Sequence, residues 1–226
     1  MSSDHYYKKW CQYMFPPIHT LFITILCSYV YFSDNNQFLF LPPTKYESWW
    51  VYPATLVSHF SNTHFISNII PYIFFSSLLE IVHGSFTAFI VFWYSGLNGV
   101  LWEVSFFNSK NLTRYTGSSP SLYGIISSYL AHIVLNWNEA PLKYVWIIVL
   151  IVEVCVVVVS SIYDENYRQT VAHSSHIFGF VQGFLISLNT IRNLVLKKWE
   201  IRLQIVSFLI SIILSICPIF IIYISY

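Results

Sequence analysis

Seven long apolar segments separated by short polar stretches dominate this sequence, and they constrain its fold more than any other feature. A helix that crosses a lipid bilayer needs about 20 mostly apolar residues. The segments are close to this length and cover residues 17–33, 54–79, 85–102, 119–136, 144–161, 173–190 and 203–225. Of the 226 residues, 56% are hydrophobic and only 9% are charged, which no ordinary soluble domain of this size shows. The sequence therefore predicts an all-α, multi-pass integral membrane protein.

The chain is predicted to form one domain, because no repeat, low-complexity tract or linker interrupts the apolar segments. Residues 1–16 are expected to be a cytoplasmic N-terminal segment, and residues 17–190 a core of six transmembrane helices. Residues 191–202 would form a basic inner loop, and residues 203–226 a seventh transmembrane helix. The formal net charge of +1 suggests neither a nucleic acid nor an acidic surface as partner, which leaves the lipid bilayer as the predicted surroundings.

The distribution of Lys and Arg predicts the orientation in the membrane, since cytoplasmic loops carry an excess of these residues. With the N-terminus inside, seven of the eleven lie on the cytoplasmic side and four outside, namely Lys8, Lys9, Lys143, Arg192, Lys197, Lys198 and Arg202 against Lys45, Lys110, Arg114 and Arg168. The predicted helices at 54–79, 119–136 and 173–190 then all begin at the outer, or lumenal, face.

Strongly polar side chains occur near the outer ends of these three helices. They are His59, His64 and Asn68, then Ser118, Ser119 and Ser121, then His173 and His176. Ionisable or strongly polar side chains are costly within a span and usually face the protein interior or a watery cavity. Because these ends lie at similar depth, these residues form a candidate functional site.

Ser119 and His176 are the residue types needed for nucleophilic catalysis. A serine hydroxyl becomes a good nucleophile when a neutral histidine within hydrogen-bonding distance takes its proton. Backbone N–H groups at the helix start, together with His64 and Asn68, could then stabilise the oxyanion. Tyr123, about one turn after Ser119, could stack on the imidazole. No carboxylate near these helix starts is an evident third member, so a Ser/His dyad is predicted.

Glycines are expected to let two of these helices approach closely. Gly179 and Gly183 form a small-xxx-small stripe, and Gly124 follows the serine motif on the partner helix. Such a contact would bring Ser119 within reach of His176.

Together these motifs resemble those of the rhomboid intramembrane serine proteases over residues 54 to 186. The matching positions are His59, His64, Asn68 and Glu80, then Gly117, Ser118, Ser119, Pro120 and Tyr123, then His176, Gly179 and Gly183. The resemblance implies a six-helix core, here with a seventh helix at the C-terminus, a nucleophilic Ser119 and a basic His176. It also implies that His59 supports the outer end of its helix and that Gly117, like Gly124, Gly179 and Gly183, serves helix packing.

Two features depart from the family pattern. Pro120 follows the predicted nucleophile where the family commonly has glycine, and it removes one N–H group. Ser119 is then expected to be the N-cap and Pro120 the first helical residue, because serine is favoured at the N-cap and proline at the first helical position. The outer loop at residues 34–53 lacks the Trp-Arg pair that many members carry.

The resemblance implies an endopeptidase that cleaves single-span membrane proteins in the outer half of the bilayer, with no metal or organic cofactor. Two alternatives remain open: an inactive relative that binds membrane clients, and a seven-helix transporter or receptor. Asn111 begins a glycosylation acceptor sequence on the predicted outer face.

Overall fold

The computed structural model describes residues 14–33, 49–106, 116–140, 143–163, 172–193 and 195–225. All the regular secondary structure in these ranges is helical: α2 (Ile18–Phe32), α3 (Val51–Thr55), α4 (Asn62–His83), α5 (Ser85–Phe106), α6 (Ser119–Leu135), α7 (Lys143–Tyr163), α9 (His173–Thr190) and α10 (Lys198–Ser225). The predicted all-α fold class is confirmed. Residues 1–13, the Asn111 acceptor sequence and most of the loop at 34–53 lie outside the described residues.

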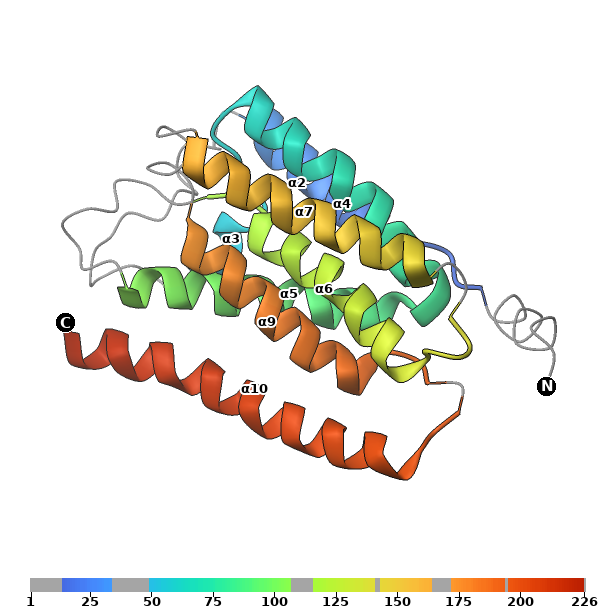
Figure 1. The fold of residues 1–226 in the computed structure, drawn as a ribbon. Helices are drawn as coiled ribbons and strands as arrows, with labels where there is room; N and C mark the ends of the chain where they lie inside the picture. The colour runs from blue at the N-terminus through green and yellow to red at the C-terminus, as the bar shows by residue number, and fades with distance from the viewer. Residues whose placement is uncertain are drawn as a thin grey trace.

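Helix α6 is the central element of the bundle. It packs against α4, α5, α7 and α9, and α9 in turn packs against α5 and α10. Figure 1 shows α2 and α4 along one side of the bundle and α10 along the opposite side. Helices α4, α6 and α9 run in one direction and α2, α5, α7 and α10 in the other, so the first turns of α4, α6 and α9 lie at the same end (Figure 1).

The predicted helix at 54–79 is two helices in the structure, α3 and α4, separated by residues 56–61. The break occurs because Ser61 is extended (φ −148°, ψ 161°) and its hydroxyl accepts a hydrogen bond from the His64 N–H at 3.2 Å, which makes it the N-cap of α4. At the other end α4 continues to His83, where Gly84 stops it with φ +92°. His59 therefore lies in the connection before α4 and not on the helix itself.

The last helix also begins earlier than expected. Residues 198–202, predicted as part of the basic loop at 191–202, already belong to α10. Glu200 explains this start, since its carboxylate accepts a hydrogen bond at 2.7 Å from the N–H of Lys197, the residue directly before the helix.

A buried carboxylate joins the first helix to the core. Glu80, fully buried near the end of α4, accepts hydrogen bonds from the backbone N–H groups of His19 (2.7 Å) and Thr20 (2.8 Å). Pro17 at the N-cap of α2 offers no side-chain cap, so Glu80 supplies one from another helix. This contact explains why a charged residue stands at this position of an apolar segment.

Polar side chains attach α10 to the bundle. Gln182 of α9 donates to the Asn98 side chain of α5 at 3.1 Å and accepts from the Ser211 hydroxyl of α10 at 2.8 Å. Trp102 of α5 donates from Nε1 to the Leu214 carbonyl at 2.8 Å. These bonds connect α5, α9 and α10 through groups that would otherwise be buried without partners.

The outward faces of the peripheral helices are apolar. Large side chains on α10 are exposed, among them Ile205, Phe208, Ile213, Ile216 and Phe220. Within the described residues, two helices are long and apolar enough to cross a membrane by length and composition, Asn62–His83 and Lys198–Ile224, while Ile18–Phe32 and Lys143–Val152 are shorter apolar stretches. An exposed apolar surface of this extent suits contact with lipid.

Candidate active site

The turn before α6 presents Ser119 at the start of that helix. Gly117 has φ +124°, a conformation that favours glycine, and its N–H donates to the Thr55 carbonyl at 2.8 Å. The helix begins at Ser119 with Ser118 as N-cap, one residue earlier than the predicted start at Pro120. Ser118 makes no side-chain cap, and its hydroxyl lies 3.4 Å from His59 Nε2. His59 thus contacts the turn that carries Ser119, and a supporting role for it stays a prediction.

Ser119 and His176 meet across the α6–α9 interface. Ser119 Oγ lies 2.8 Å from His176 Nε2, within hydrogen-bonding distance. Tyr123, the next turn of α6, stacks on the imidazole with ring centroids 4.5 Å apart and an interplanar angle of 25°. His176 Nδ1 has no hydrogen-bond partner among the described residues. Within the described ranges, the imidazole is therefore oriented by Ser119, by Tyr123 and by its own helix, and not by a carboxylate.

His64 and Asn68 lie beside this pair on α4. A Cβ added to Gly117 would lie 2.5 Å from His64 Cε1, so the imidazole packs directly on the turn before Ser119. Asn68 is buried, and its Nδ2 donates to the His64 carbonyl at 2.8 Å. In this structure Asn68 therefore braces the first turn of α4, and an oxyanion role for either side chain stays a prediction.

Glycines hold α6 and α9 in backbone contact. A Cβ on Gly183 would lie 2.5 Å from the Gly124 carbonyl oxygen, and one on Gly179 would lie 2.9 Å from Pro120 Cα. These three glycines therefore sit in a helix interface, as their spacing suggests. Gly117 differs from them, since it lies in the turn before α6 and is needed there for its positive φ and for the space that His64 fills.

Pro120 is part of the packed interface. It is buried within the first turn of α6, where the backbone N–H groups have no intrahelical acceptor, so its missing donor leaves no hydrogen bond broken. Its ring fills the space that Gly99 leaves on α5, because a Cβ on Gly99 would lie 2.7 Å from Pro120 Cβ, while its backbone lies against Gly179 of α9. Proline in place of the family's glycine is thus accommodated next to Ser119.

Glu103 is a buried residue that contacts the first turn of α9, which carries His176, and no sequence motif predicted this contact. It lies in the last turn of α5 with 1% of its surface exposed, and its Oε2 accepts a hydrogen bond from the Ser175 N–H at 2.8 Å. The available signal was a lone carboxylate directly after the apolar segment 85–102, where a charged group is costly without a specific partner.

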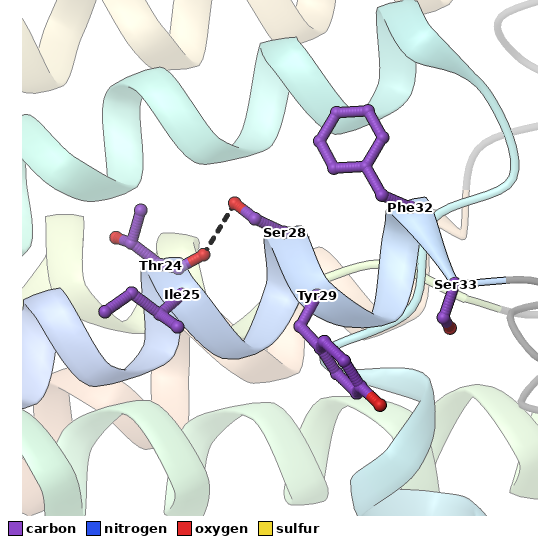
Figure 2. Close-up of a pocket in the computed structure, with 6 residues that line it drawn as sticks. All are labelled: Thr24, Ile25, Ser28, Tyr29, Phe32 and Ser33. Atoms are coloured by element: carbon purple, nitrogen blue, oxygen red, sulfur yellow. Dashed lines mark hydrogen bonds between the residues drawn. The ribbon is translucent and has the colours of Figure 1, made fainter.

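A surface hollow lies elsewhere, on α2. It is lined by Thr24, Ile25, Ser28, Tyr29, Phe32 and Ser33. Figure 2 shows Phe32 and Tyr29 pointing to opposite sides of the helix, while the Ser28 hydroxyl donates to the Thr24 carbonyl at 2.8 Å. These groups do not converge on a common point, so the hollow offers no second catalytic constellation. In the part of the chain that the structure describes, no group of three or more His, Cys, Asp or Glu is arranged to hold a metal ion.

Comparison with known proteins gives one consistent family. A model described as the rhomboid domain matches residues 46–193. Rhomboid-related protein 1 of Caenorhabditis elegans is 25% identical over 219 residues, which cover 85% of this chain and 60% of that protein. RHOMBOID-like protein 1 of Arabidopsis thaliana is 25% identical over 142 residues, which cover 63% of this chain and 34% of that protein.

The chain thus spans less than two thirds of the length of either relative. The matched segment, however, contains α3 to α9 and with them Ser119, His176 and the helices that hold them. Because this match covers more than half of the sequence, the chain belongs to the rhomboid family of integral membrane proteins.

Proposed function

We propose that this protein is an intramembrane serine endopeptidase that cleaves other membrane proteins with a Ser119–His176 dyad. The observation that carries the proposal is the 2.8 Å separation of Ser119 Oγ and His176 Nε2. A nucleophile within hydrogen-bonding distance of its base is the arrangement that acyl transfer requires. The stacked Tyr123 ring adds support, because it limits the orientations that the imidazole can adopt.

The reaction follows from these atoms. With its proton on Nδ1, His176 accepts the Ser119 proton at Nε2 while Oγ attacks the carbonyl carbon of the scissile bond. The backbone N–H of Ser119 and the His64 side chain are the proposed donors to the oxyanion. The imidazolium then gives its proton to the leaving amine, and an acyl-enzyme forms. Water, deprotonated by His176, attacks this ester and restores the serine hydroxyl.

The proposed substrates are single-span proteins whose helix unwinds near small or helix-breaking residues. A spanning helix satisfies its own backbone groups and so hides the scissile bond from a nucleophile. With the N-terminus in the cytoplasm, the first turns of α4, α6 and α9 would lie in the outer half of the bilayer, and cleavage would occur there.

Cleavage of a tagged single-span substrate in liposomes tests the proposal. Ser119→Ala and His176→Ala should each lower the rate by at least about 10³-fold, and Ser119→Ala should also abolish labelling by a serine-directed fluorophosphonate. Ser121→Ala is the matched control, because the Ser121 hydroxyl is buried on the same helix with no hydrogen-bond partner among the described residues. That variant should cleave at close to the wild-type rate.

Folded wild-type protein that neither cleaves nor reacts with the fluorophosphonate would refute the proposal. The same protein would then be tested for binding of membrane clients, since an inactive relative would keep the fold without the chemistry.

A further inference from the structure

Helix α9 begins without a cap of its own. Its N-cap residue, Ala172, has no side chain that can accept a hydrogen bond. The first N–H groups of a helix have no intrahelical partner, and leaving them unsatisfied in a buried place is costly. A group outside α9 must therefore accept hydrogen bonds from these N–H groups.

Glu103 is the acceptor. Its Oε2 lies 2.8 Å from the Ser175 nitrogen, and Ser174 also hydrogen-bonds to this carboxylate. Glu103 belongs to α5 and lies 72 residues away in the sequence. The first turn of α9 is thus held by a carboxylate from a neighbouring helix, as the first turn of α2 is held by Glu80.

A second contact from α5 fixes the same turn. Gly99 lies one turn before Glu103, and a Cβ added to it would lie 2.6 Å from the Ser175 carbonyl oxygen and 2.7 Å from Pro120 Cβ. The backbone of α5 therefore touches both the turn that carries His176 and the residue that follows Ser119. Helix α5 thus contacts residues on both sides of the proposed dyad, next to His176 on α9 and next to Ser119 on α6.

The position of Ser175 determines where its neighbour points. Successive helical residues are turned by about 100° around the axis. With Ser175 held against α5, His176 is directed toward α6, where its Nε2 reaches Ser119 Oγ at 2.8 Å. Among the described residues, His176 Nδ1 has no hydrogen-bond partner, so no carboxylate in this part of the chain orients the imidazole directly.

From these contacts we propose that Glu103 is a positioning residue of the reaction, which holds the first turn of α9 so that His176 faces Ser119. The inference rests on the proposed protease function. It assigns the orientation of His176 to a carboxylate that does not hydrogen-bond to the imidazole. Glu103 acts through the α9 backbone and does not touch the reacting atoms.

Two substitutions at Glu103 separate positioning from bulk. Glu103→Ala removes the acceptor and should lower kcat about 10- to 100-fold in folded protein, with KM within about twofold, because His176 acts in the transition state. Glu103→Gln keeps a carbonyl oxygen that can accept from the Ser175 N–H, and it should retain kcat within about threefold. Hydrogen exchange should rise in the first turn of α9 in Glu103→Ala and stay near wild type in Glu103→Gln.

Glu80→Ala is the matched control, since Glu80 is an equally buried carboxylate that caps α2 in the same way. This variant should lower thermal stability and raise hydrogen exchange at the start of α2, while kcat of the folded protein stays near wild type. Wild-type kcat in folded Glu103→Ala, or an equal loss of kcat in Glu80→Ala, would overturn the inference alone. A wild type that neither cleaves substrate nor reacts with a fluorophosphonate would instead overturn the proposed function, and the positioning role with it.

Discussion

Substitution of Gly183 by alanine should separate α9 from α6 and thereby disconnect His176 from Ser119. The added Cβ would lie 2.5 Å from the Gly124 carbonyl oxygen, whereas ordinary contacts begin at 3.4 Å. The helices must therefore move apart by about 0.9 Å, the difference between these two distances. No side-chain rotation can relieve the clash, because the opposing atoms belong to the α6 backbone.

This movement is large compared with the tolerance of a hydrogen bond. A rigid retreat of α9 lengthens the Ser119–His176 distance from 2.8 Å to as much as about 3.7 Å, beyond the range of a hydrogen bond. Displacements of about 1 Å can cost about 100-fold in rate, and overpacking costs about 1–3 kcal/mol of stability. Gly183 is seven residues from His176, so the loss of activity would come through the helix and not through direct contact.

The assay combines thermal unfolding in detergent with the rate of fluorophosphonate labelling of the folded fraction. Gly96→Ala is the comparison variant, because its added Cβ meets side chains, the Ser121 hydroxyl and Leu56 Cδ1, that can move aside. Gly96→Ala should lose less thermal stability and less labelling rate than Gly183→Ala. Wild-type stability together with wild-type labelling in Gly183→Ala would refute the backbone contact between α6 and α9. Lower stability with unchanged labelling would refute the coupling between that contact and the dyad.

Two further substitutions test the ring stack and the attachment of α10. Tyr123→Ala should lower kcat roughly two- to tenfold, because an aromatic contact contributes about 0.5–1.5 kcal/mol. Tyr123→Phe keeps the ring, so its kcat should stay near wild type. Equal cleavage rates for the two variants would contradict a role for stacking. Gln182→Leu should lower the free energy of unfolding by about 1–3 kcal/mol and raise hydrogen exchange in α10, because it leaves polar groups on α5 and α10 without their partner. Ser187→Ala on the same helix removes a buried hydroxyl that has no partner among the described residues and should change neither quantity, so equal effects of the two would argue against this attachment.

Much of the fold could be predicted because its signals are local. Apolar runs of about 20 residues mark helices wherever the chain meets lipid, and all seven predicted segments correspond to helices in the described residues. The relation of Gly179 to Gly183, four residues apart, likewise indicates a packing stripe without knowledge of the partner. Periodicity in the sequence is enough for conclusions of this kind.

Helix boundaries were less predictable, since they depend on a few hydrogen bonds within an apolar background. The break between α3 and α4 follows from the extended backbone of Ser61 and its bond to His64, whereas the sequence predicted one continuous helix through this polar stretch. The start of α10 at Lys198 depends in the same way on the Glu200 carboxylate.

The sequence alone therefore determined that the chain is an all-helical membrane protein and which residue types its candidate site contains. Only the tertiary structure decided how those residues are held. Glu103 caps α9 from 72 residues away, and Pro120 fills a space left by Gly99 and Gly179 on two other helices. Such partners share no spacing in the sequence, because contacts between helices depend on how each helix is rotated and how closely it approaches its neighbours.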